Sequence, residues 1–315
     1  MSNVANPAGF ATHAPNALSR RHLAYFGFWL VANLAMLPAL LRLVRLSLGE
    51  DWCSYIVLIP FIAAWLIYLR RAEIFISAQP AWRGAAVGVL AGAALILIGF
   101  RLDAGYGSTL LGLGVALVWT AGFYGCYGRR AARAALFPLL FCFLFAPLPL
   151  SSVNRLIVWL QAGSTWLCVV MFHIVRVPVY REGFVLALPG VTIRVAKECS
   201  SIRSSEALAI TALLAGYLSL QSPGRRALLV LIAIPLSVFK NGVRIVTLTL
   251  LSLYVNPGFL YGRLHHEGGF VFFAIAVVLL WPALILLARG ERQPAPSGRA
   301  RAAASAPGSS GGQAP

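Results

Sequence analysis

Nine apolar stretches run through the chain, and their lengths constrain its fold more than any other feature. Most are close to the roughly 20 residues that a helix needs to cross a lipid bilayer. Hydrophobic residues make up 59% of the sequence and charged residues only 11%, which is more apolar material than one globular core uses. We therefore predict an all-α polytopic membrane protein. The stretches cover residues 23–46, 54–69, 84–100, 107–127, 134–150, 155–175, 205–221, 227–255 and 269–288.

The positive charge of the chain is concentrated beside these stretches. The formal net charge is +17, from 26 Lys and Arg against 9 Asp and Glu. A soluble domain with this excess would be a candidate for binding nucleic acid. Membrane proteins, however, collect Lys and Arg in their cytoplasmic loops, so we expect no nucleic-acid partner. The clusters predicted to be cytoplasmic are Arg20/Arg21, Arg70/Arg71, Arg129/Arg130, Arg225/Arg226 and the tail arginines Arg289, Arg292, Arg299 and Arg301.

The arginine clusters also determine how many stretches can cross. From a cytoplasmic N-terminus, four crossings return the chain to Arg129/Arg130, and a fifth ends outside at Pro147-Leu148-Pro149. Only one of the stretches 155–175 and 205–221 can then cross, because Arg225/Arg226 must lie inside. The stretch 155–175 is predicted to be an interfacial helix, because it contains Gln161, Ser164, Thr165 and His173. About eight transmembrane helices result, with both termini cytoplasmic.

The segments around these helices have distinct compositions. The predicted transmembrane domain covers residues 20–289, and residues 1–19 form a cytoplasmic segment without the pattern of a cleavable signal peptide. Residues 290–315 are rich in Ala, Pro, Gly and Ser and are predicted to be a disordered basic cytoplasmic tail. Residues 177–195 alternate apolar and polar side chains around Pro189-Gly190, so we predict a short extracytoplasmic β-hairpin.

Cys199 is the cysteine whose neighbours in the sequence favour a reactive thiolate. Lys197 lies two residues before it and Arg203 four residues after it, whereas the other four cysteines lie in or beside apolar runs. Neighbouring cations stabilise the thiolate, which is the nucleophilic form of cysteine. Cys199 is therefore the first candidate for a nucleophile, and Glu198 beside it is a candidate to orient a cation or to form a surface ion pair.

A second candidate site lies inside the apolar stretch 227–255. Lys240 and Arg244 are four residues apart and share a helix face, and Asn241 is three residues from Arg244. An arginine at membrane depth costs about 3 kcal/mol on insertion scales, and it usually persists because it faces a cavity or pairs with an anion. The alternative is an arginine that reaches the interface from near a helix end.

A histidine pair, His265-His266, precedes the last apolar stretch and is predicted to lie on the same side of the membrane as Cys199. A cysteine nucleophile needs a base or an ion-pair partner, and histidine titrates in the working pH range. Two histidines at a membrane boundary can also be simple interfacial residues. The run His265-His266-Glu267 is too short to close a metal site alone, so we expect no metal or cofactor.

These motifs together resemble the exosortase/archaeosortase family. The resemblance covers roughly residues 50–288, and the combination in this order is specific where each motif alone is weak. Ser201 stands where many members have glycine, and Cys53-Ser54 replaces a frequent His-Gly pair. The motifs are Tyr55–Pro60, Leu69-Arg70-Arg71, Pro147-Leu148-Pro149, Arg181-Glu182-Gly183, Val195–Ser204, Asn241–Ile245 and His265 four residues before Gly269.

The resemblance implies a function and roles for these residues. Members of the family are polytopic cysteine transpeptidases of the bacterial inner membrane. They cut a C-terminal sorting signal of exported proteins at the extracytoplasmic face, and this signal is a short Pro-Glu-Pro-like motif followed by a membrane helix and basic residues. Cys199 would then be the nucleophile, Arg244 the arginine partner and His265 the histidine. Asn241, Arg203, Glu198 and His266 are the candidate supporting residues.

Another class of protein also fits part of the pattern. A polytopic transporter, or an assembly factor for the export of extracellular polymers, would also bury Arg244 and Asn241. It would not need a thiol on the same side as the histidine pair. The other expected partners are exported proteins with the sorting signal and membrane lipid.

The arginine clusters lead to a test of the topology. A reporter fused after Arg130 or after Gly224 is expected to report a cytoplasmic position, and one fused within residues 180–192 an extracytoplasmic one. Paired alkaline phosphatase and fluorescent protein fusions measure this directly. A cytoplasmic signal from residues 180–192 would contradict the eight-helix topology and the shared side of Cys199 and His265.

Overall fold

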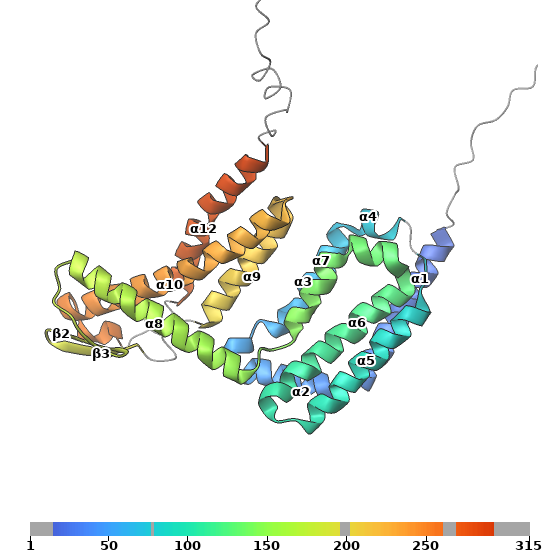
Figure 1. Cartoon of the computed structure of the whole chain (residues 1–315), viewed down its shortest axis with the longest axis horizontal. Coiled ribbons are helices and arrows are strands. Elements are labelled where there is room, and N and C mark those ends of the chain that lie inside the picture. Colours follow the sequence, from blue (N-terminus) through green and yellow to red (C-terminus); the bar gives the residue numbers. More distant parts are fainter. Residues whose placement is uncertain (1–14, 77–78, 196–201, 261–268, 293–315) are drawn as a thin grey trace, which may run out of the picture. The chain divides into compact units, whose positions relative to one another are not determined.

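The computed structural model describes residues 15–76, 79–195, 202–260 and 269–292 (Figure 1). Helices account for most of these residues, and the described part also contains one small antiparallel sheet. The chain divides into two compact units, Met1–Leu156 and Ile157–Pro315. The mainly helical character that the apolar stretches predicted is therefore confirmed.

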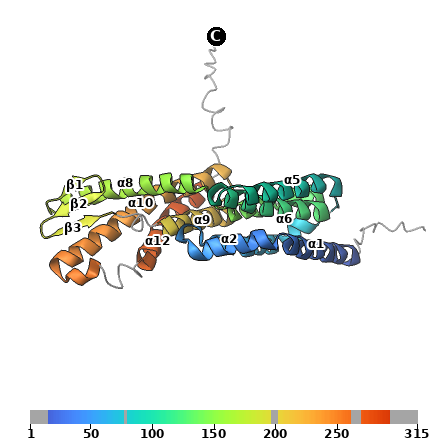
Figure 2. The same cartoon turned by 90° about the horizontal axis from the view of Figure 1, so that it is seen from below.

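A closely packed helix pair runs through the first unit. Helices α5 (Trp82–Arg101) and α6 (Ala104–Ala134) are consecutive and lie side by side (Figure 2). A Cβ atom at Gly92 would lie 2.8 Å from the carbonyl oxygen of Gly114, and one at Gly114 would lie 2.7 Å from that of Gly92. The two backbones approach this closely because glycines face each other.

The remaining elements of the first unit are helix α1, with 21 residues, and several shorter helices. Helices α1, α4 and α6 meet in an aromatic cluster in which the His22 ring nitrogen Nδ1 lies 2.8 Å from the Tyr127 hydroxyl, and the rings of Phe75 and Phe123 also contact Tyr127. The elements are α1 (Pro15–Ala35), α2 (Leu37–Gly49), η1 (Asp51–Cys53), η2 (Ile56–Leu58), α3 (Ile59–Leu69), α4 (Arg71–Phe75), α7 (Leu136–Phe141) and η3 (Cys142–Phe145).

The apolar stretch 23–46 forms two helices instead of the one span that the sequence predicted. Helices α1 and α2 meet at Met36 with a bend of 75°. Pro38 lies in the first turn of α2, where a missing N–H has no intrahelical partner to lose. In a continuous helix its ring would clash with the carbonyl of Leu34, so the chain breaks here.

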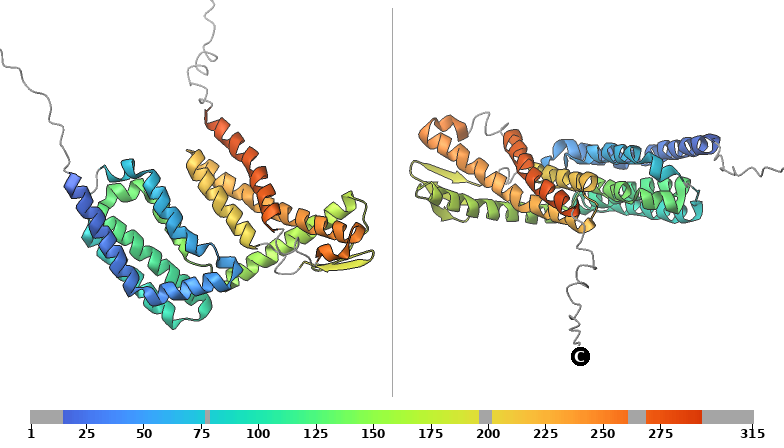
Figure 3. Two further views of the ribbon diagram at one scale, coloured as in Figure 1. Left: turned by 180° about the vertical axis from the view of Figure 1, so that it is seen from behind. Right: turned by 90° about the horizontal axis from the view of Figure 1, so that it is seen from above.

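The second unit combines four long helices with the sheet. Helix α8 runs beside α10, and α9 and α12 pack against the first half of α10 (Figure 3). Helix α8 begins at Leu150, within the first unit, and continues into the second. The elements are α8 (Leu150–Ile174), β1 (Tyr180–Glu182), β2 (Val185–Leu188), β3 (Val191–Arg194), α9 (Ile202–Ser219), α10 (Pro223–Tyr254), η5 (Pro257–Leu260) and α12 (Gly269–Arg292).

The predicted β-hairpin is confirmed as strands β2 and β3. Leu188 pairs with Val191, so Pro189-Gly190 is a two-residue turn, and Gly190 has a φ of +86°. Glycine adopts this left-handed conformation without the steric cost that a side chain would add. Strand β1 pairs with β2 across a second turn and adds a third strand that the sequence did not predict.

Two apolar clusters form the core of the second unit. The sheet cluster joins the end of α8, the sheet and the second half of α10, and it contains Phe172, Leu186 and Val246. The bundle cluster joins α9, α12 and the first half of α10, and it contains Leu208 and Ala276. The same helix α10 therefore contributes to two separate cores.

Hydrogen bonds fasten one end of this bundle. The Glu291 carboxylate accepts the backbone N–H groups of Gln221 and Ser222, each at 2.8 Å. The Arg225 guanidinium donates to the carbonyl oxygens of Leu287 at 2.9 Å and Gly290 at 3.0 Å. These bonds satisfy backbone groups at the start of α10 and at the end of α12, which helix termini otherwise leave without partners.

Five described helices are long and apolar enough to cross a membrane, namely α5, α6, α8, α10 and α12, and the bent pair of α1 and α2 would be a sixth. The predicted number of eight is not confirmed. Helix α8, which its polar residues placed at the interface in the sequence-based prediction, is among the five, whereas α9 is not. The polar residues Gln161, Ser164 and Thr165 of α8 are buried by protein, so they do not require an interfacial position.

Gly128 in α6 provides a test of this fold. Its φ of 79° and ψ of −174° belong to a region that only glycine occupies readily, and a Cβ atom there would lie 1.8 Å from the Gln79 carbonyl oxygen. Gly128→Ala should therefore destabilise the protein by about 2 kcal/mol or more. Gly27→Ala is the matched control, because its Cβ would meet nothing within 4 Å. Thermal unfolding in detergent measures both, and equal melting temperatures would contradict the close approach of Gly128 to Gln79.

Candidate functional site

A band of polar side chains separates the two apolar clusters of the second unit. On α10 the bundle cluster extends to Leu236 and the sheet cluster begins at Ile245. The residues between them include four with polar side chains. We use the name polar band for these four residues and for their polar neighbours on α8 and α9. The band consists of Ser237, Lys240, Asn241 and Arg244 of α10, Gln161, Ser164 and Thr165 of α8, and Ser204 of α9.

Helices α8 and α10 are joined in this band by a buried hydrogen bond. The Asn241 amide nitrogen Nδ2 donates to the Ser164 hydroxyl at 2.9 Å, and the two residues are 1% and 0% exposed. The helices also pack closely here, because a Cβ atom at Gly242 would lie 2.7 Å from the Leu167 side chain. Asn241 is thus positioned by α8, and it holds α10 in one rotational setting against that helix.

Lys240 links α10 to the first turn of α9. Its ammonium group donates to the Ser204 hydroxyl, and the lysine is only 3% exposed. Arg244 follows one turn later on the same helix and is half-buried. Within the described residues, the buried oxygens Ser205 Oγ and Glu206 Oε2 on α9 have no hydrogen-bond partner.

The chain is also anchored where the sheet ends. The Gln161 side-chain amide donates to the carbonyl oxygen of Val195 at 2.9 Å, and the Val195 N–H donates to the carbonyl oxygen of Phe184 at 2.9 Å. Val195 is the last described residue before Ile202, where α9 begins. Cys199 lies between these two points in the sequence. Gln161 binds Val195 before it, and Lys240 binds Ser204 after it.

The predicted site residues divide into two groups. Arg244 and Asn241 both lie in the polar band, and Arg203 is exposed in the first turn of α9. Cys199, Glu198, His265 and His266 lie outside the described residues, so the catalytic trio of Cys199, Arg244 and His265 stays a prediction.

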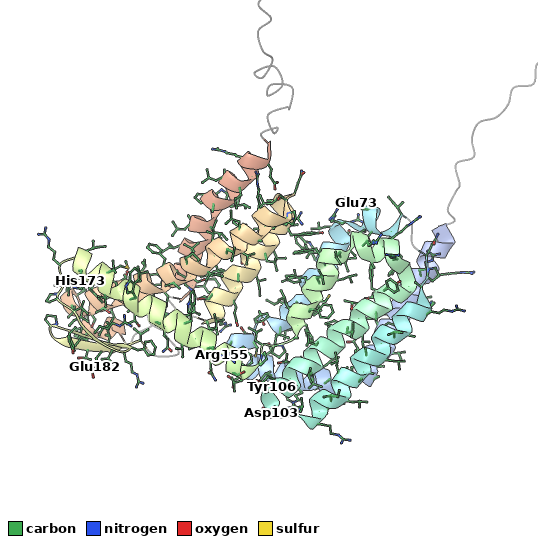
Figure 4. All side chains as sticks on the ribbon, viewed as in Figure 1. Glu73, Asp103, Tyr106, Arg155, His173 and Glu182 are labelled. Atoms are coloured by element: carbon green, nitrogen blue, oxygen red, sulfur yellow. The ribbon has the colours of Figure 1, made fainter. Side chains whose placement is uncertain are left out.

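Two other titratable side chains lie on α8. His173 is exposed near the end of α8, and its Nδ1 atom lies 2.8 Å from the carbonyl oxygen of Val169 (Figure 4). Cys168 is buried in the sheet cluster, with its sulfur 3.8 Å from the Gly242 carbonyl oxygen. In the described part of the chain, no group of three or more His, Cys, Asp and Glu residues could hold a metal ion.

Several band residues were not identified as site residues by sequence reasoning. Gln161 and Ser164 were interpreted as signs of an interfacial helix, although they are three residues apart and so share a helix face. This spacing was the available signal, because a polar face on an apolar helix can bind a neighbouring helix instead of the interface. Ser204 gave no such signal before its lysine partner was located.

The fold and the band define a polytopic helical membrane protein with a buried polar site. The family model of the transmembrane exosortases matches residues 47–282. The chain therefore belongs to the transmembrane exosortase family, as its motifs predicted, and this family is associated with the processing of sorting signals. Comparisons with curated proteins and with solved structures gave no match.

The bond between Asn241 and Ser164 can be tested by removing its acceptor. Ser164→Ala should destabilise the protein by about 1–3 kcal/mol, because the buried Asn241 amide loses an acceptor that water cannot replace. Ser151→Ala in the same helix is the control: Ser151 and its 3.2 Å hydrogen bond with the Tyr106 hydroxyl are exposed to water, so this change should stay within about 0.5 kcal/mol. Thermal unfolding in detergent compares the two, and a double change with Asn241→Leu should cost less than the sum of the single changes.

Proposed function

We propose that the protein is a membrane cysteine transpeptidase that cleaves the C-terminal sorting signal of exported proteins at the extracytoplasmic face of the bacterial inner membrane. The observation that supports this best is the anchoring of Val195 and Ser204 by the polar band. These two residues flank Cys199 in the sequence, and the band that binds them also contains Asn241 and Arg244. Family membership supports the same reaction class.

The chemistry begins at the cysteine. The Cys199 thiolate attacks the carbonyl carbon of the scissile peptide bond and forms a tetrahedral intermediate. Arg244 stabilises the negative charge that develops on the carbonyl oxygen, because its guanidinium is always charged and offers several donors. The carbon–nitrogen bond then breaks, His265 gives its proton to the leaving amine, and a thioester remains on Cys199.

The second half of the reaction resolves the thioester. An amine or a water molecule attacks the acyl carbon, His265 accepts the proton of this nucleophile, and the Cys199 thiolate leaves. An amine gives transpeptidation and water gives hydrolysis. The substrate is an exported protein whose short motif is followed by a membrane helix and basic residues, so the enzyme meets it within the lipid bilayer.

Substitutions at the proposed trio test this function. Cys199→Ala, Arg244→Ala and Arg244→Lys should each lower processing of a co-expressed substrate by about 100-fold or more, because a lysine cannot reproduce the guanidinium fork. Cys126→Ala is the control and should process normally, because Cys126 is buried in the aromatic core of the first unit. Gel mobility and mass spectrometry of the substrate measure the cleavage.

The histidine assignment is part of the same experiment. His265→Ala should abolish processing and His266→Ala should retain most of it, because the histidine of the family motif lies four residues before Gly269, which is the position of His265. Normal processing by Cys199→Ala would contradict the transpeptidase. It would instead favour a transporter or an assembly factor, which does not need the thiol.

A further inference from the structure

Lys240 is a buried cation that the proposed mechanism does not use. It lies in the middle of the 32-residue helix α10 and is 3% exposed. Its side chain is enclosed by protein and does not reach water or headgroups, so snorkelling does not explain this position. A positive charge in a membrane-embedded helix costs several kcal/mol unless an anion or a polar site compensates it.

The described surroundings of Lys240 offer hydroxyl and amide groups but no negative charge. Its ammonium group donates to the Ser204 hydroxyl, and buried Ser237 and Asn241 lie near it on α10. Among the described residues, no carboxylate lies within ion-pair distance of it. Glu206 is only two residues from Ser204 on α9 and therefore points to another side of that helix. Arg244, one turn away, adds a second positive charge.

The first turn of α9 also favours an anion at this place. The free backbone N–H groups at the start of a helix attract negative charge. Ser204 and Ser205 stand in this turn, and Ser205 Oγ is buried without a hydrogen-bond partner among the described residues. The buried lysine and the first turn of α9 thus both favour a negative charge beside Ser204.

We infer that Lys240 is a recognition residue that binds an acidic side chain of the sorting signal beside the first turn of α9. The inference rests on the proposed function, which supplies a peptide substrate. A peptide carboxylate is favoured over a lipid phosphate, because Lys240 is only 3% exposed and is enclosed by protein, and a peptide is the molecule that the proposed reaction brings to the polar band. Lys240 selects the substrate, and Arg244 is left to act on the scissile carbonyl.

A comparison of acidic and amidated substrates tests the inference. The wild-type protein should process a sorting signal at least about tenfold better than the same signal with its acidic residue changed to the amide, measured as the ratio of kcat/KM values. Lys240→Met should bring this ratio close to one. Lys240→Glu should reverse the preference and favour a signal with a lysine at that position.

Two controls separate recognition from folding. Methionine has nearly the length of lysine, and replacing a buried charge by an apolar residue usually preserves the fold. Ser252→Ala changes a buried hydroxyl on α10 that lies outside the polar band, so the preference for the acidic signal should stay. A wild-type ratio in Lys240→Met would overturn the inference, whether or not the overall rate changes.

Binding to an inactive protein gives a readout that does not depend on catalysis. Cys199→Ala in lipid nanodiscs should bind a fluorescent signal peptide about tenfold more tightly than its amidated form, and adding Lys240→Met should remove the difference. This distinguishes a failure of recognition from a failure of the proposed reaction. Loss of the difference in anionic but not in zwitterionic lipid would show that Lys240 binds a headgroup, and it would overturn the inference.

The chain itself contains an acidic residue that requires a separate variant. Glu198 precedes Cys199 in the sequence and lies outside the described residues. If Glu198→Gln and Lys240→Met lower the binding of acidic and amidated peptides equally, Lys240 pairs within the protein and does not read the substrate. The inference expects Glu198→Gln to keep the acidic preference of the wild-type protein.

Discussion

The need to satisfy polar groups inside an apolar helix bundle governs the second unit. Helix α10 carries Lys240, Asn241 and Arg244 between two apolar clusters, and none of these side chains can be buried without partners at an acceptable cost. Hydroxyl groups on α8 and α9 supply partners for the lysine and the asparagine. The rotational settings of α8 and α9 around α10 therefore follow from the polar band as much as from apolar packing.

The band also explains how a small sheet can help to build a membrane site. Strands β2 and β3 bury Leu186 and Ile193 against α8 and α10, so the sheet is part of the core. The chain leaves this sheet at Val195, whose carbonyl oxygen is bound by Gln161. The bonds of Gln161 to Val195 and of Lys240 to Ser204 therefore fix both the exit from the sheet and the first turn of α9 to the same polar band.

Sequence reasoning recovered the helical class, the hairpin and the family, because each depends on local signals. Apolar length, the Pro189-Gly190 turn and the Cys199, Arg244 and His265 motifs can all be read without tertiary information. It failed where the environment decides the meaning of a residue. Ser164 looks interfacial in the sequence, but it is buried and accepts a hydrogen bond from Asn241, which is 77 residues away. Pro38 likewise divides a stretch that hydropathy alone treats as one continuous helix.

The close contact of α5 and α6 has a consequence for biogenesis. The two helices are adjacent in the chain, and their facing glycines let them pack without help from distant residues. Contacts of low sequence separation form fast, and N-terminal parts of a chain fold before the rest has been synthesised. We therefore expect this pair to assemble as a helical hairpin while the ribosome is still translating the second unit, which would keep its glycine surfaces from contacting the wrong helices in the membrane.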